Sequence, residues 1–126
     1  MKTSRLLLGL LACLTVFPAG AGAGDHDRLT IRVSPAVCFA PANLQVRATI
    51  VSDPENRAVQ VVAESSEFYR SSEIQLEGDR APRTSLFEFR SLPSGTYEVR
   101  ATLRGSSGRE LALVRQQVNV IASSGR

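Results

Sequence analysis

Hydrophobic side chains recur at every second position through most of residues 28–121, and no stretch of ten or more residues places them at helical spacing. In NLQVRATIV (43–51), the apolar residues fall on one parity, whereas Gln45, Arg47 and Thr49 fall on the other. Such alternation is typical of a half-buried β-strand, because successive side chains of a strand point to opposite faces. The pattern therefore predicts an all-β protein.

Turns containing proline, glycine or asparagine interrupt this alternation and divide it into seven expected strands. These strands are residues 28–33, 43–51, 58–64, 72–76, 85–89, 96–103 and 110–121. The short 72–76 segment is flanked by serines, which favours a sheet edge. In the last strand the apolar positions change phase, which predicts a bulge or bend near residues 114–116. Seven short strands over about 100 residues fit a β-sandwich.

Residues 1–23 have the composition of a secretory signal peptide. Lys2 and Arg5 precede the apolar run LLLGLLACLTVF (6–17), and small residues follow it. This run is shorter than the roughly 20 residues that a membrane-spanning helix needs. We expect an exported protein, periplasmic or extracellular, with one domain over residues 24–126 and no transmembrane segment after cleavage. LLAC (10–13) loosely resembles a lipobox, so lipidation at Cys13 is the alternative.

Charge is nearly balanced once the expected signal peptide is removed. The whole chain has a formal net charge of +3, and the loss of Lys2 and Arg5 reduces it to about +1. Positive and negative residues are interspersed in the remainder, and every remaining positive side chain is arginine. No extended positive field remains to attract a phosphate backbone, so a nucleic-acid partner is not expected.

Cys38 is the single cysteine after residue 23, which excludes an intramolecular disulfide in the mature chain. Within AVCFAP (36–41) it fits a small buried hydrophobic residue. The alternative is an exposed free thiol that links this chain to another.

SLPSGTYEVRATL (91–103) resembles the corner between strands E and F of immunoglobulin-like and fibronectin type III-like domains. In these families a Leu-Pro-x-Gly-x-Tyr turn leads into strand F, and the tyrosine hydroxyl bonds back to the backbone of the corner. Leu92, Gly95 and Tyr97 match that pattern. The resemblance, to a bacterial Ig-like domain, implies a Greek-key sandwich of about seven antiparallel strands and brings no catalytic residues. The cysteine pair and tryptophan of antibody domains are absent, so antibody-type recognition is not implied.

Residues suited to catalysis or metal binding are sparse. His26 is the single histidine and lies between Asp25 and Asp27 near the expected new N-terminus, where a polar tail is the simpler interpretation. The serines have neither a histidine base within the expected fold nor a G-x-S-x-G motif. The acidic turns DPEN (53–56) and EGD (77–79) lack the spacing of a calcium loop. We therefore expect no metal, no cofactor and no enzymatic activity.

ESSEFYRSSE (64–73) contains the first candidate binding residues, Phe68, Tyr69 and Arg70. Tyrosine and arginine among serines are a composition suited to recognition. Adjacent positions of a strand face opposite sides, so both rings cannot be buried together. The alternative is that Phe68 fills the core while Tyr69 lies along the sheet.

A second candidate is an arginine-rich outward face interleaved with Glu98 and Thr102, for which cross-strand pairing between arginine and glutamate is the alternative explanation. Its members are Arg32, Arg47, Arg100 and Arg104.

These observations favour a non-catalytic exported module that binds a protein or glycan partner in the cell envelope or outside the cell. One alternative is a structural or assembly subunit that self-associates through edge strands or Cys38. An enzyme with an undetected site is the third possibility.

Overall fold

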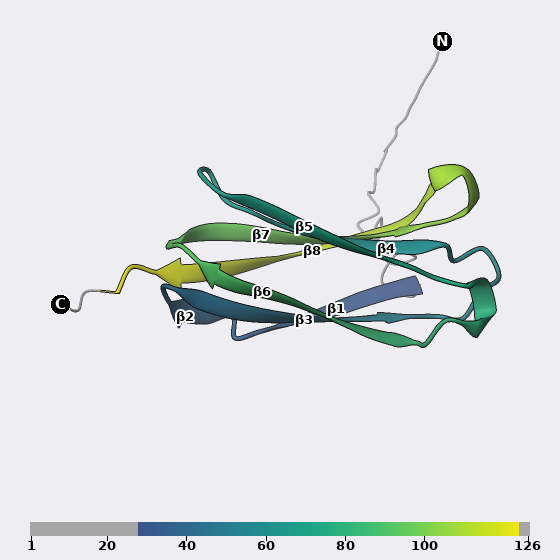
Figure 1. Cartoon of the computed structure of the whole chain (residues 1–126), viewed down its shortest axis with the longest axis horizontal. Helices are drawn as coiled ribbons and strands as arrows, with labels where there is room; N and C mark the ends of the chain where they lie inside the picture. The colour runs from purple at the N-terminus through teal and green to yellow at the C-terminus, as the bar shows by residue number, and fades with distance from the viewer. Residues whose placement is uncertain (1–27, 124–126) are drawn as a thin grey trace, which may run out of the picture.

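The computed structural model describes residues 28–123, which form two β-sheets packed face to face (Figure 1). The expected signal peptide (1–23), Cys13 within it and the Asp-His-Asp segment (25–27) lie outside the described residues. Across residues 28–123, no helix is long and apolar enough to cross a membrane.

One sheet has three strands and the other has five. The three-stranded sheet has the order β1-β3-β6, with β1 (Leu29–Ser34), β3 (Ala42–Ile50) and β6 (Thr84–Leu92). The five-stranded sheet has the order β2-β8-β7-β4-β5, with β2 (Val37–Phe39), β8 (Glu110–Ile121), β7 (Gly95–Arg104), β4 (Ala58–Glu64) and β5 (Tyr69–Gln75). Two short 3₁₀ helices, η2 (Gly78–Arg80) and η3 (Ser106–Gly108), lie in loops at one end of the sandwich, on the right in Figure 1.

The predicted all-β sandwich is confirmed, and a strand is present in each of the seven predicted stretches. The expected edge segment is the edge strand β5, although β5 already begins at Tyr69. The structure adds β2, which lies outside the seven predicted strands. It pairs with β8 in parallel, whereas the other strand pairs are antiparallel. Three residues between prolines are too few to show an alternating pattern.

Alternation on each strand places the apolar residues between the two sheets. Along β3, each even-numbered residue from Ala42 to Ile50 is buried, whereas the odd-numbered residues lie toward solvent. The opposing sheet contributes Val61, Val99 and Leu103, which are fully buried. Burial of a Val or Leu side chain stabilises a fold by about 1.5–3 kcal/mol, so this shared core holds the two sheets together.

The predicted bulge near residues 114–116 is wrong. The buried residues of β8 all have even numbers: Ala112, Val114, Val118 and Val120. The register with β7 shifts only opposite Leu103 and Arg104, beside the turn. Leu111 and Leu113 led to the error, because both are apolar and yet only half-buried, on the opposite parity from the core residues.

Tyr97 links the loop before β7 to the core. Its ring is fully buried, and its hydroxyl donates a hydrogen bond to the backbone oxygen of Pro93 at 2.7 Å. Gly95 has a φ of +154°, a conformation that side chains rarely adopt, and Leu92 is fully buried beside the turn. This contact has the form of a tyrosine corner. Burial raises the pKa of the Tyr97 phenol and outweighs the opposing effects of Ser65 and Arg70.

We predict that Tyr97→Phe lowers the free energy of unfolding by about 1 kcal/mol, because it removes one buried hydrogen bond and keeps the ring. Tyr69→Phe is the matched control, since the Tyr69 side chain is 57% exposed. Urea denaturation of both variants measures the difference. Equal stability of the two variants would contradict a structural role for the Tyr97 hydroxyl.

Candidate functional site

The first candidate surface is divided by the fold. Phe68 is half-buried against the core, and its ring meets the Tyr97 ring edge to face at 6.2 Å between centroids. Arg70 lies 5.1 Å above the Phe68 ring and donates a hydrogen bond to the backbone oxygen of Arg90 at 3.0 Å. Tyr69 and Arg70 are both exposed, whereas Phe68 is not. Phe68 therefore contributes to packing, whereas Tyr69 and Arg70 remain accessible at the surface.

Cys38 is half-buried and packs against the core. Its neighbours Val37 and Phe39 are 56% and 65% exposed, since they have the opposite parity on β2. This placement favours the interpretation of Cys38 as a small hydrophobic residue.

The arginine-rich outward face is not one surface. Arg32 and Arg47 belong to β1 and β3 of the three-stranded sheet, whereas Arg100 and Arg104 belong to β7 of the five-stranded sheet. The prediction of a single face is therefore wrong, because alternation shows which residues share one side of a strand but not which sheet contains that strand.

On the five-stranded sheet, the arginines are paired with side chains of the protein itself. Arg100 contacts Glu98 at 2.7 Å and Glu64 at 3.1 Å, and Arg115 contacts Glu98 at 3.3 Å. The hydrogen bond with Glu98 is the main cause that raises the pKa of Arg100. Arg104 donates a hydrogen bond to the side chain of Gln60 at 3.1 Å. The predicted pairing of arginine with glutamate is confirmed at Arg100.

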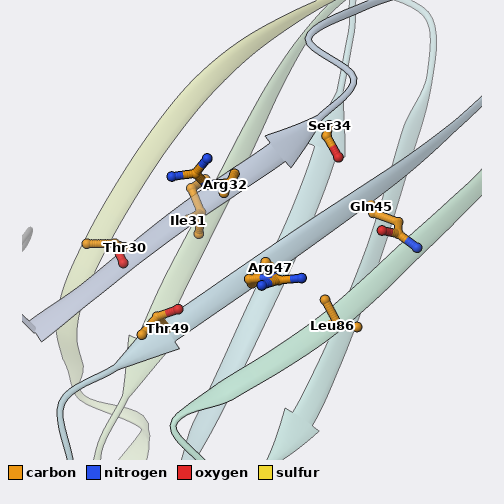
Figure 2. Close-up of a pocket in the computed structure, with 8 residues that line it drawn as sticks. All are labelled: Thr30, Ile31, Arg32, Ser34, Gln45, Arg47, Thr49 and Leu86. Carbon is orange, nitrogen blue, oxygen red and sulfur yellow. The ribbon is translucent and has the colours of Figure 1, made fainter.

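On the three-stranded sheet, Arg32 lies directly opposite Arg47 in the antiparallel pair β1–β3. Figure 2 shows both side chains on these neighbouring strands, with Leu86 on β6 beside Arg47. Within residues 28–123, neither guanidinium has an ion pair or a side-chain hydrogen bond. Two like charges at directly opposed positions repel each other, so the positive charge of this pair is not balanced by these contacts and is unfavourable.

Both arginines line a groove of about 680 Å³. The hydroxyls of Thr30, Ser34 and Thr49 and the amide of Gln45 also line it (Figure 2). None of its lining residues is acidic. The groove therefore presents two positive charges among neutral groups that form hydrogen bonds, which suits a polar ligand carrying negative charge.

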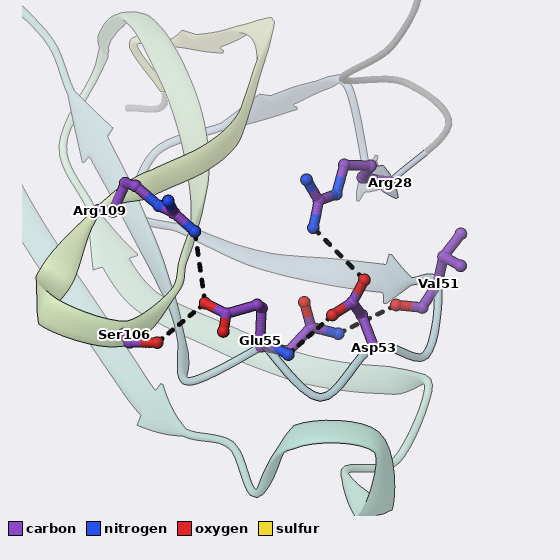
Figure 3. A network of polar contacts seen from close by, with 7 residues as sticks. Arg28, Val51, Asp53, Glu55, Ser106 and Arg109 are labelled. Carbon is purple, nitrogen blue, oxygen red and sulfur yellow. Dashed lines mark hydrogen bonds and ion pairs between the residues drawn. The ribbon is translucent and has the colours of Figure 1, made fainter.

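The acidic turn DPEN (53–56) takes part in a network of polar contacts, which Figure 3 shows. Asp53 accepts a hydrogen bond from the backbone nitrogen of Glu55 at 2.7 Å and pairs with Arg28 at 3.7 Å. Glu55 accepts a hydrogen bond from Ser106 at 2.8 Å and pairs with Arg109 at 3.4 Å. The Ser106 hydroxyl is the main cause that lowers the pKa of Glu55. In the described part of the chain, no cluster of three or more His, Cys, Asp or Glu residues could hold a metal ion.

Comparison with known proteins supports the fold. No protein-family model matches the chain, and no curated protein matches it. Among solved structures, a superoxide reductase (neelaredoxin) from Ignicoccus hospitalis is 16% identical, with a TM-score of 0.55, over 74% of this chain and 80% of that one. A variant of that enzyme gives a TM-score of 0.57 at 16% identity, over 81% and 86% of the two chains.

A family 76 glycoside hydrolase from a bovine Bacteroides thetaiotaomicron strain is also similar. It is 16% identical with a TM-score of 0.53, over 73% of this chain but only 20% of the hydrolase chain. At such identities the similarity concerns the fold alone, which is all-β.

We predict that Phe68→Ala lowers the free energy of unfolding by about 2 kcal/mol, less than the cost at a fully buried phenylalanine, because the ring is half-buried. The adjacent control Tyr69→Ala is expected to change it by less than about 0.5 kcal/mol. Thermal and urea unfolding provide the measurement. A larger loss for the Tyr69 variant would contradict the packing role assigned to Phe68.

Proposed function

We propose that this chain is a non-catalytic exported module, of the Ig-like or fibronectin type III-like kind, that binds a protein or glycan partner in the cell envelope or outside the cell. Its binding surface is the outer face of the three-stranded sheet. Export is supported by the composition of residues 1–23.

The strand arrangement supports the Ig-like assignment. Strands β1, β3 and β6 correspond in order to strands A, B and E of that fold, and β4, β7 and β8 correspond to C, F and G. Tyr97 occupies the corner between the equivalents of E and F. One departure from the constant-type arrangement is β5, which pairs with β4 rather than with β6.

The observation that carries the proposal is the difference between the two outer faces. On the five-stranded sheet, Arg100 and Arg115 are neutralised by acidic side chains of the chain itself. On the three-stranded sheet, Arg32 and Arg47 have no such partners among residues 28–123, and they lie in a groove lined by further hydrogen-bonding groups. Unsatisfied charge gathered on a rigid sheet favours recognition of a second molecule.

We predict that Arg32→Gln/Arg47→Gln loses its partner in a crosslinking pull-down from the native envelope, whereas the wild type retains it. The matched control is Arg104→Gln/Arg109→Gln, which removes the same charge from positions outside the groove. Circular dichroism verifies that each variant is folded. Capture of the same partner by the groove variant would overturn the assignment of this face.

A structural subunit that self-associates through β2 is the second candidate function. Val37, Phe39 and Ile121 expose 56%, 65% and 44% of their surfaces, and Phe39 lies opposite Ile121 in the β2–β8 pair. These three residues form an apolar patch at the edge of the five-stranded sheet, where contact with a second copy would bury it.

If the chain self-associates through β2, the sedimentation coefficient of the wild type rises with protein concentration. That of Phe39→Ser is expected to stay constant over the same concentrations. Val51→Ser is the control, because Val51 is similarly exposed but lies outside β2. Electrophoresis with and without reducing agent tests a Cys38-linked form. A monomer at all concentrations would eliminate this candidate.

A further inference from the structure

We infer that the groove between Arg32 and Arg47 binds the carboxylate of an acidic sugar unit in a polysaccharide. The inference rests on the proposed function of this face and specifies the chemistry of its partner. It is carried by the arrangement of the two arginines, by a second arginine pair in the same molecule and by the neutral groups around the groove.

The second arginine pair, Arg100 and Arg115, shows how a carboxylate can lie between two opposed arginines. Arg100 on β7 lies directly opposite Arg115 on β8, as Arg32 lies opposite Arg47. One carboxylate, that of Glu98, bridges this pair, with one oxygen 2.7 Å from Arg100 and the other 3.3 Å from Arg115. A single carboxylate can therefore serve two opposed guanidinium groups on this scaffold.

In the part of the chain that the structure describes, the first pair, Arg32 and Arg47, has no equivalent carboxylate. Glu98 stands two residues before Arg100 and so shares its side of β7. The corresponding positions beside Arg32 and Arg47 carry neutral side chains: Thr30, Ser34, Gln45 and Thr49. Glu88 on the neighbouring strand β6 is opposite Gln45 and pairs with Arg90 at 3.1 Å. A carboxylate from a ligand would complete the arrangement that Glu98 completes on the other sheet.

The neutral groups around the two arginines suit a sugar. The three hydroxyls and one amide both donate and accept hydrogen bonds, as sugar hydroxyls do. The groove lies on the sheet formed by β1, β3 and β6, and its lining side chains come from all three strands (Figure 2). Leu86, 59% exposed beside Arg47, offers an apolar contact to the carbon face of a sugar ring.

Other anionic polymers fit less well. Protein interfaces are enriched in aromatic residues at their centre, and no aromatic residue lines this groove. Nucleic acids and densely sulfated chains need many cationic contacts, whereas the groove provides two and the mature chain has a net charge of about +1. A sparsely charged carboxylated glycan matches both the number of arginines and the planar guanidinium geometry.

The test is isothermal titration calorimetry of the purified protein with an oligogalacturonate, and with its methyl ester as the neutral control. We expect binding of the acid form and at least about tenfold weaker binding of the ester, since the ester lacks the charge that the arginines recognise. Arg32→Gln/Arg47→Gln is expected to weaken binding by at least about tenfold. Arg104→Gln/Arg109→Gln should remain within about twofold of the wild type, because neither residue lines the groove.

Arg32→Lys/Arg47→Lys keeps the charge but loses the planar fork, and is expected to bind with intermediate affinity. Polyglutamate and dextran sulfate serve as the competing acidic peptide and sulfated chain. Tighter binding of either one than of oligogalacturonate, or equal binding of the acid and the ester, would overturn the inference.

Different results would contradict the proposed binding face and the proposed sugar ligand. If the groove variant loses its envelope partner while the wild type ignores oligogalacturonate, the sugar inference is wrong and the binding face stands. If the groove variant keeps its envelope partner, the binding face itself is wrong.

Discussion

Burial of the inner side of the three-stranded sheet is the constraint on which the groove depends. Leu29 and Val33 of β1 and Val46 of β3 are at most 5% exposed, and a slip of one residue would turn them all toward solvent. Each such side chain stabilises the fold by about 1.5–3 kcal/mol, whereas cross-strand pairs contribute about 0.2–1 kcal/mol. The core therefore determines the register, and the register places Arg32 opposite Arg47 despite their repulsion.

The two outer faces differ in how the charge of their opposed arginines is balanced. Each outer face contains a pair of arginines at directly opposed positions, and among residues 28–123 an acidic side chain contacts the pair Arg100–Arg115 only. Glu98 and Glu64 together balance the charges of Arg100 and Arg115 on the outer face of the five-stranded sheet, so little of that charge remains for a partner. The face of β1 and β3 keeps its two charges, and its strands are held on their inner side by the core. A ligand would meet donors that are already in place, which reduces the ordering cost of binding.

Alternation along the chain was sufficient to predict the seven main strands and the sandwich, because a strand with one buried face must alternate. It was not sufficient to predict the groove, because opposition of Arg32 and Arg47 is a property of pairing between strands. The same limit led to the grouping of these residues with Arg100 on one face.

Asn56 illustrates a second limit. It lies in a polar turn by sequence, yet it is fully buried and donates a hydrogen bond to the backbone oxygen of Val51 at 2.9 Å.

Arg32 and Arg47 form an unrelieved charge pair on a regular sheet. Arg57, Arg80 and Arg83 also make no side-chain ion pair within residues 28–123, but they lie between strands. The loop carboxylates Asp53 and Glu55 have partners, and so do Arg100 and Arg109. A glutamate at position 45 or 49 would stand beside Arg47 as Glu98 stands beside Arg100, and it would remove the repulsion within a strand that tolerates it. The chain instead carries Gln45 and Thr49 there, which retain hydrogen bonding without negative charge. Local features that forgo available stability are typical of functional sites, and this is the physical reason for our proposal that the face of β1 and β3 binds a partner.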